Sequence, residues 1–293
     1  YLLTVPPRRP GPKRKRGKRG KGGAGIYPGL AALGIFGNAT PALSAEVARE
    51  VTEANSVQVA LASLSQRGLE LGAEPALRLT YLLAGRALRH REEWMTAQEE
   101  LRARGESLPS GPLAGKRVVI SLDGGRVRLR VPALSGRRNE KTGHRKYEAP
   151  WREPKLVTIY TVGPDGKRDH SFPVVLDGVL DDADAAVRLL IAHLWRQGAH
   201  EAAHVTLVAD GADWIWNRAK QIRTALGLTE AQFTEVVDWS HATEYLGETA
   251  KKRRGWTEQE RAAWLSMATR RLHDGEAEQV FLELAVLLDG AAE

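Results

Sequence analysis

The pattern of apolar and polar positions divides the chain into a helical first part and a second part in which strands and helices alternate. Residues 40–104 carry apolar side chains at helical spacing, and Ser44, Asn55 or Ser56, and Pro75 are placed to begin three helices. Two short helices around a glycine turn are compatible with a helix-turn-helix that binds DNA, although a plain scaffold is the commoner use of such a pair.

A linker rich in proline and glycine, residues 109–115, precedes short apolar runs that are typical of strands. Strands are expected at 117–122, 127–131, 156–162, 204–209 and 233–237, and a further extended segment is expected at 171–176. Helices are expected at 181–195, at 213–226 and from residue 240 onward. Gly124 and Gly125 would form a tight hairpin turn between the first two strands, and residues 137–152 would form a long charged loop. The pattern predicts an α/β fold in which helices flank a mixed sheet.

Length and composition limit the class of protein. With 293 residues, of which 42% are hydrophobic, the chain can bury one large domain with a smaller appendage. No run of about 18 apolar residues is present, so no membrane span is expected. The absence of cysteine excludes disulfides and thiolate zinc sites and fits a cytoplasmic location. Because the chain does not begin with methionine, we expect a fragment or a processed protein.

The positive charge is concentrated in residues 1–27. These residues hold nine Lys and Arg and no acid, so the rest of the chain carries a net charge of −2 out of the total of +7. Interleaved glycine and proline predict a flexible arm that contacts DNA phosphates, and a solubilising tail is the alternative. The cations of its central run are Arg14, Lys15, Arg16, Lys18 and Arg19.

Two further basic runs have a solvated surface as their default interpretation, and DNA contact is the alternative. One follows a predicted helix and consists of Lys251, Lys252, Arg253 and Arg254. The other lies in the long loop and consists of Arg137, Arg138, Lys141, Arg145 and Lys146.

Two aspartates at the ends of apolar strands are the main candidates for catalytic chemistry. Asp123 follows the strand at 117–122, and Asp210 follows the strand at 204–209. Carboxylates delivered by two buried strands can share Mg²⁺ or Mn²⁺, and such ions promote attack on a phosphodiester. In the ordinary structural interpretation, Asp123 only starts a turn with Gly124, and Asp210 only caps a helix that opens at Ala212.

The chain resembles a known family of DNA-recombining enzymes. The order of three strands followed by helix, strand, helix, strand, helix is that of a ribonuclease H-like fold. The segments that carry the resemblance are Leu122-Asp123-Gly124-Gly125-Arg126-Val127, Glu153-Pro154-Lys155, Asp210-Gly211-Ala212-Asp213-Trp214-Ile215-Trp216 and Asp238-Trp239-Ser240-His241. They resemble bacterial insertion-sequence transposases, the DDE enzymes of the Mutator-like branch in the Kra group. The resemblance covers most of the chain from about Pro28.

The resemblance implies roles for four residues. Asp123 and Asp210 would be the first two members of a catalytic, metal-binding triad, and Asp238 with His241 would be an accessory element. A helix cap at Asp238 and a buried, hydrogen-bonded His241 is the alternative for that pair. We expect packing roles for Trp214, Trp216 and Trp239. The implied partners are double-stranded DNA, at the element ends and at the target, and further copies of the chain, in association with the nucleoid.

The third acid of the family has no clear counterpart in this sequence. The family places a glutamate in a Gly-Ser-Gly-x-x-Glu setting that is absent here. Glu244, Glu248 and Glu283 are candidates to which no role is assigned. We therefore expect a truncated transposase with an incomplete site, with a stand-alone ribonuclease H-like nuclease or an inactive DNA-binding remnant as alternatives. The expected parts are an arm (1–27), a helical region (28–108), a catalytic domain (116–252) and the start of a helical insertion (253–293).

Overall fold

The computed structural model describes residues 28–35, 39–132, 138, 140–141, 143 and 147–289. By its internal contacts the chain divides into two compact units, Tyr1–Trp94 and Met95–Glu293, and each is described by itself. The long helix α4 (Ala73–Ala103) begins in the first unit and ends in the second. No helix in the described part of the chain combines the length and the hydrophobicity that crossing a bilayer requires.

The first unit is helical. It contains α1 (Pro28–Ala32), α2 (Pro41–Glu53), α3 (Val57–Gln66) and the first part of α4. Helix α2 begins before the expected Ser44, because Thr40 accepts a hydrogen bond from the Leu43 amide and Pro41 fits the first turn. Ser56 caps α3, as predicted. The core of this unit consists of Ala39, Val47, Leu64, Ala76 and Leu79.

Helices α2 and α3 are joined by ion pairs rather than by a glycine turn. The connection between them is residues 54–56, and Gly68 and Gly72 lie between α3 and α4 instead. Arg67, at the end of α3, pairs with Glu46 and Glu50 of α2. The two helices therefore share a charged network on their surface as well as the apolar core, and a role in DNA binding stays a prediction.

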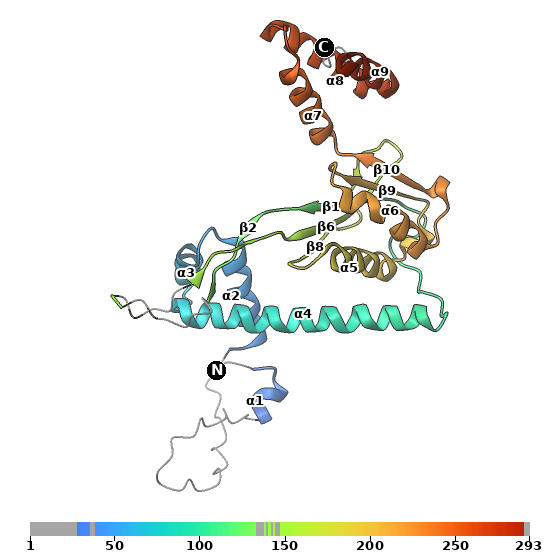
Figure 1. The fold of residues 1–293 in the computed structure, drawn as a ribbon. Coiled ribbons are helices and arrows are strands. Elements are labelled where there is room, and N and C mark those ends of the chain that lie inside the picture. The colour runs from blue at the N-terminus through green and yellow to red at the C-terminus, as the bar shows by residue number, and fades with distance from the viewer. Residues whose placement is uncertain are drawn as a thin grey trace. The chain divides into compact units, whose positions relative to one another are not determined.

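The second unit is built on a mixed sheet (Figure 1). Its strands are β1 (Arg117–Gly124), β6 (Lys155–Val162), β7 (Arg168–Asp169), β8 (Val175–Val179), β9 (His204–Ala209) and β10 (Phe233–Val237). The order is β10-β9-β1-β6-β7, and β8 also pairs with β6. Strands β1, β9 and β10 are mutually parallel, whereas β6 is antiparallel to its neighbours. The expected α/β class with a mixed sheet flanked by helices is confirmed.

Helices α5 (Ala183–Arg196) and α6 (Asp213–Leu226) pack against each other, and α5 contacts β6. Asp182 caps α5 by accepting a hydrogen bond from the Ala185 amide. Two short 3-10 helices, Ala199–Glu201 and Glu230–Gln232, precede β9 and β10. The buried side chains at the centre of this unit include Ile120, Leu122, Ile159, Leu190, Leu194, Leu207 and Ile222. This core holds the parallel strands whose ends form the candidate site.

The predicted hairpin turn at Gly124 and Gly125 is wrong. Neither glycine has the positive φ that a tight hairpin turn requires, and the Gly125 amide instead donates to the Pro154 carbonyl at 3.0 Å. The chain runs straight on into β2 (Val127–Arg128) and β3 (Val131–Pro132). These pair with β5 (Trp151–Arg152) and β4 (Tyr147–Glu148), so part of the expected charged loop is strand.

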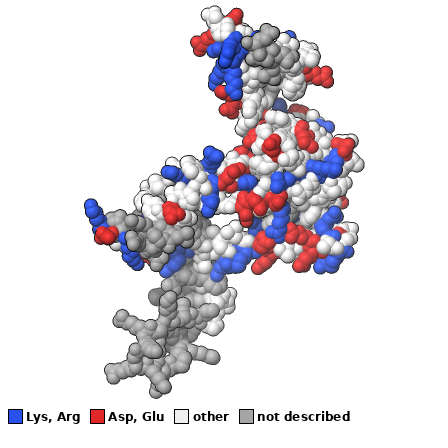
Figure 2. Space-filling view, viewed as in Figure 1, with Lys and Arg blue, Asp and Glu red and all other residues white. Residues whose placement is uncertain are grey.

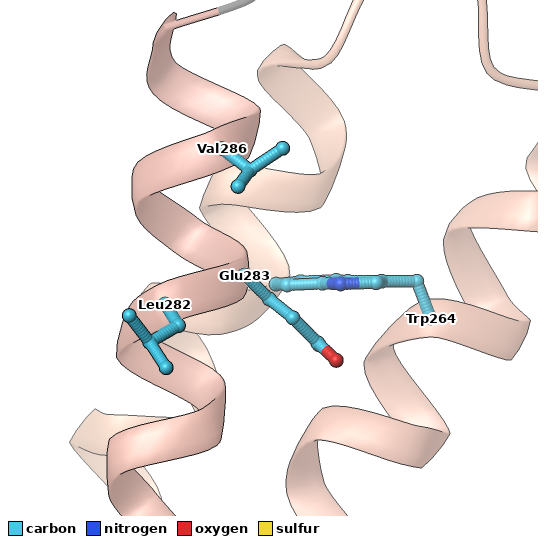
Figure 3. A pocket seen from close by; sticks show the side chains of 4 residues that line it. All are labelled: Trp264, Leu282, Glu283 and Val286. Atoms are coloured by element: carbon cyan, nitrogen blue, oxygen red, sulfur yellow. The ribbon is translucent and has the colours of Figure 1, made fainter.

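Three helices follow the last strand: α7 (Trp239–Lys252), α8 (Glu258–His273) and α9 (Ala277–Asp289). Their shared core is Leu246, Ala250, Trp264, Ala268 and Val280. Trp264 faces side chains of α9 across a groove of about 360 Å³, which Leu282, Glu283 and Val286 also line (Figure 3). The helices predicted within residues 257–290 are therefore present.

Candidate metal and nucleic-acid site

Asp123 and Asp210 occupy equivalent positions on neighbouring parallel strands. Ser121 of β1 lies opposite Val208 of β9, so two residues further along Asp123 comes level with Asp210. Positions that are level on parallel strands share a face of the sheet, and adjacent strands are about 4.8 Å apart. Asp123 is exposed, and no described residue forms a hydrogen bond or an ion pair with its side chain. The structure thus brings both aspartates to one edge.

Asp238 adds a third carboxylate to this edge. Val237 of β10 lies opposite Ala209 of β9, and the Asp238 amide donates to the Ala209 carbonyl at 2.7 Å. Asp238 is therefore level with Asp210, on the side away from Asp123. We call the row of Asp238, Asp210 and Asp123 at the carboxyl ends of β10, β9 and β1 the acidic edge.

Asp238 and His241 form a hydrogen-bonded pair at the start of α7. Asp238 Oδ2 lies 2.9 Å from His241 Nδ1 and also accepts from the His241 amide at 3.4 Å, so Asp238 is the cap of the helix. The two side chains are 36% and 41% exposed, for Asp238 and His241 respectively. The alternative to an accessory role was a helix cap at Asp238 with a buried His241. The cap is present, but His241 is not buried. The accessory role of the pair stays a prediction.

The charges of this pair are coupled to Asp210. The hydrogen bond that His241 donates to Asp238 raises the pKa of His241, and the negative charges of Asp210, Asp238 and Glu244 act in the same direction. The hydrogen bond from His241 in turn lowers the pKa of Asp238. The pair therefore favours an imidazolium beside a carboxylate, close enough to Asp210 for its charge to matter.

The loop after β9 orients Asp210. Asp210 Oδ1 accepts a hydrogen bond from the Ala212 amide at 2.9 Å, which closes a turn before α6 begins at Asp213. The carboxylate thus shapes the turn and does not cap the helix. A Cβ added at Gly211 would lie 3.1 Å from the Tyr245 hydroxyl, so α7 contacts this loop through Tyr245. The close contact favours glycine beside Asp210.

Glu153 and Lys155 lie beside Gly124, the residue that follows Asp123, and the sequence analysis did not predict this contact. Lys155 pairs with Gly124 across β1 and β6, and a Cβ on Gly124 would lie 2.9 Å from Glu153 Oε1. The Lys155 side chain is nearly buried, with Nζ 3.6 Å from Glu153 Oε1 and 5.5 Å from the centre of the Trp214 ring. The sequence signal is a lysine that opens an otherwise apolar strand. It places one acid and one ammonium next to the acidic edge.

The remaining glutamates differ in their surroundings. Glu244 is near enough to His241 to raise its pKa, whereas Glu248 pairs with Lys251 at 2.7 Å and Glu283 pairs with Arg271. Among the described residues, no three His, Asp or Glu side chains are close enough together to hold a metal ion. Because Mg²⁺ keeps several waters and takes one or two protein carboxylates along with substrate phosphates, metal binding at the acidic edge stays a prediction.

The predicted DNA-binding cations are only partly described. Arg14, Lys15, Arg16, Lys18 and Arg19 lie outside the described residues. Lys252 and Arg254 are exposed at the end of α7, and Lys251 is exposed but paired with Glu248. Arg253 is half-buried and contributes a carbonyl to Arg261. Trp239 meets His273 edge-on but stays largely exposed, so the packing role predicted for it is only partly met.

Comparison with models of protein families, with curated proteins and with solved structures gave no match. A functional proposal for this chain is therefore carried by the acidic edge and by the residues around it. The decisive features are the register of three parallel strands and the exposed carboxylate of Asp123, which no described residue engages.

Proposed function

We propose that the chain is an insertion-sequence transposase of the DDE type, which cleaves and transfers DNA strands with Mg²⁺ or Mn²⁺ in a ribonuclease H-like fold. The observation that carries the proposal is that Asp123, Asp210 and Asp238 are level at one edge of the sheet. Three antiparallel strands precede two strands parallel to the first, with helices between them, which supports the fold assignment. A fold alone does not establish an activity, so the site carries the argument.

In this proposal Asp123 and Asp210 hold the metal. Once bound, the ion supplies activation of a water or a 3′-hydroxyl and stabilises the oxygen that leaves. Asp123 offers a carboxylate that no described residue engages, and the Ala212 amide fixes the orientation of Asp210. His241, charged through its hydrogen bond with Asp238, places a proton donor beside the acids where it can bind a phosphate oxygen.

Metal binding is the first test, because its readout does not depend on turnover. Titration of the whole chain with Mn²⁺, followed by electron paramagnetic resonance, should show a site that Asp123→Asn and Asp210→Asn weaken at least about tenfold, since even residues behind metal ligands change affinity about 10–100-fold. Asp177→Asn, on β8, is the matched control and should retain the site. Equal affinity in the wild type and in both acidic-edge variants would refute the assignment of the ligands.

Activity is the second test. The chain, Mg²⁺ and labelled DNA from the flanks of its own gene should give cleaved ends and joined products, and both should be lost in Asp123→Asn. Cleavage without joining would instead identify a stand-alone nuclease. Retained DNA binding without any metal-dependent reaction would identify an inactive DNA-binding remnant.

A further inference from the structure

Residues 125–132 and 147–154 form a two-stranded ribbon, which we call the ribbon. We propose that the ribbon binds the phosphates of duplex DNA beside the acidic edge. The proposal rests on the proposed function only in taking DNA as the substrate. Its argument comes from the register of the ribbon, from the arginines along one of its faces and from the aromatic rings that hold them.

The ribbon is a direct extension of the central sheet. Arg117 lies opposite Val162 and Gly124 opposite Lys155, and the same register continues to Pro132 opposite Tyr147. The ribbon therefore leaves the sheet immediately after Asp123, as the green strands of Figure 1 show. Eight residues at about 3.3 Å each carry it roughly 26 Å beyond β1. A molecule held along the ribbon would reach the acidic edge at its base.

One face of the ribbon carries a row of arginines. Arg126, Arg128 and Arg130 alternate with Val127 and Leu129, so the three share a face. Residues opposite each other in an antiparallel pair point the same way, which places Trp151 and Tyr147 on this face as well. The three arginines and both rings are exposed, Trp151 by 59% and Tyr147 by 53%.

The aromatic rings hold two of these arginines in place. The Arg128 guanidinium carbon lies 5.2 Å from the centre of the Trp151 ring, and that of Arg130 lies 3.7 Å from the centre of the Tyr147 ring. Stacking on a ring orders the planar guanidinium while leaving its N–H groups free to bind phosphate in a bidentate manner. The row is thus pre-ordered for an anionic ligand.

Charge and shape both favour duplex DNA as that ligand. The ribbon itself contains four arginines, at 126, 128, 130 and 152, against two glutamates, at 148 and 153, whereas the whole of residues 28–293 carries a net charge of −2. Figure 2 shows how the Lys, Arg, Asp and Glu side chains of the described residues are distributed over one face of the molecule. A two-stranded ribbon also has a width that the major groove of DNA admits, and the regular spacing of the arginines follows a regular row of phosphates.

The test measures how the affinity for DNA depends on salt. Fluorescence anisotropy of the whole chain with a labelled 30-base-pair duplex gives the slope of log affinity against log salt for the wild type and for Arg128→Ala/Arg130→Ala. Loss of two phosphate contacts should reduce the magnitude of the slope by about 2. The matched control, Lys167→Ala/Arg168→Ala, removes the same charge from exposed residues at the far end of β6 and should keep the wild-type slope. An unchanged slope in the arginine variant would overturn the proposal.

Two further variants separate the charge of the arginines from their ordering by the aromatic rings. Tyr147→Leu/Trp151→Leu removes the rings but keeps the charge. It should therefore weaken binding several-fold while the salt slope stays near that of the wild type. Arg128→Lys/Arg130→Lys keeps the charge but removes the planar guanidinium, and it should behave in the same way. Wild-type affinity in both would contradict the role given to the rings. Circular dichroism and thermal unfolding identify any variant that has lost its fold.

Separate experiments test duplex DNA as the partner of the ribbon and test the proposed function. The same measurement with a 30-nucleotide single strand should show a smaller effect of Arg128→Ala/Arg130→Ala, and an effect confined to the single strand would overturn the assignment to duplex DNA. Asp123→Asn should keep the wild-type slope, because it removes no cation. If Arg128→Ala/Arg130→Ala reduces the salt slope while the wild type shows no metal-dependent cleavage, the ribbon assignment stands and the proposed function fails. If the wild type cleaves DNA but the salt slope of the variant is unchanged, the proposed function stands and the ribbon assignment fails.

Discussion

At the scale of single residues, the Asp238–His241 pair connects the ionisation of the site with its geometry. The hydrogen bond to Asp238 raises the pKa of His241 above its usual value near 6.5, and the same bond lowers the pKa of Asp238. The interaction of the two charges therefore persists over a widened pH window. It is lost above that window when His241 loses its proton and below it when Asp238 gains one.

The change that tests this pair is Asp238→Asn. In an NMR titration of the chain in the presence of EDTA, the His241 ring should titrate above 6.5, and the variant should move its pKa downward, because the first-ranked cause of the shift has been removed. The residual charges of Asp210 and Glu244 should keep part of the shift. A His241 titration that is the same in both proteins would show that the 2.9 Å contact does not exist in solution.

The residues of the acidic edge could be predicted from the sequence more easily than their neighbours. Asp123 and Asp210 each follow a run of apolar residues, and the ends of parallel strands meet at one edge of a sheet. The contact of Glu153 with Gly124 depends on the pairing of β1 with β6, which local patterning does not encode. The exposure of His241, which decides against the buried alternative, could not be predicted for a similar reason, because burial depends on tertiary packing around α7.

At the scale of elements, the connection after α5 illustrates a constraint that acts through backbone contact. Gly198 has a φ of +76°, and a Cβ there would lie 2.3 Å from the Gly111 amide nitrogen. Gly227, which ends α6, has a φ of +67° but meets nothing within 4 Å. The two positions share a left-handed backbone and differ in the space around them, so they form a matched pair.

We expect Gly227→Ala to cost about 1 kcal/mol of unfolding free energy, the usual penalty for a side chain in the left-handed region. Gly198→Ala should cost more than that, about 3 kcal/mol or above, because backbone atoms of residues 110–111 must move as well. Urea unfolding of both variants measures the difference. Equal losses of unfolding free energy in the two variants would mean that the loop at Gly111 can move aside without a measurable energetic penalty.

Element positions were predicted well where periodicity alone decides them. The strands at 204–209 and 233–237 and the helix at 213–226 have the predicted bounds. The extended segment expected at 171–176 becomes a strand only from Val175, because Asp169 binds the Lys116 ammonium at 2.8 Å and accepts from the Ser171 amide at 2.8 Å. These bonds hold residues 168–171 as a short strand and a turn. Side-chain interactions over 53 residues of sequence lie outside any local pattern.

At the scale of the whole molecule, three segments far apart in sequence form one site through the sheet. Residues 123, 210 and 238 come level only because β9 inserts between β1 and β10 with all three strands parallel. The order of strands and helices in the sequence favoured such a sheet, and crossover helices such as α6 make the parallel pairing possible. The ribbon could not be predicted in this way, because Gly124 and Gly125 at its base also suit a tight turn.

The distribution of charge gives a prediction for the whole chain. Replacing the nine Lys and Arg of residues 1–27 by glutamine changes the net charge from +7 to −2. If every one of these cations meets a phosphate, the magnitude of the salt slope should fall by up to about 8, since each contact contributes about 0.9. The same anisotropy titration measures it, and a slope that stays at its wild-type value would support the solubilising tail.

The ribbon variant provides the companion measurement at this scale. Arg128→Ala/Arg130→Ala in the glutamine-substituted chain should remove a further slope of about 2, because charges in separate segments act on separate phosphates and their effects add. A combined loss that is clearly smaller than the sum would show that the two basic segments compete for the same phosphates. Additive losses would instead mean that the arm and the ribbon contact different stretches of one duplex, with the acidic edge at the base of the ribbon.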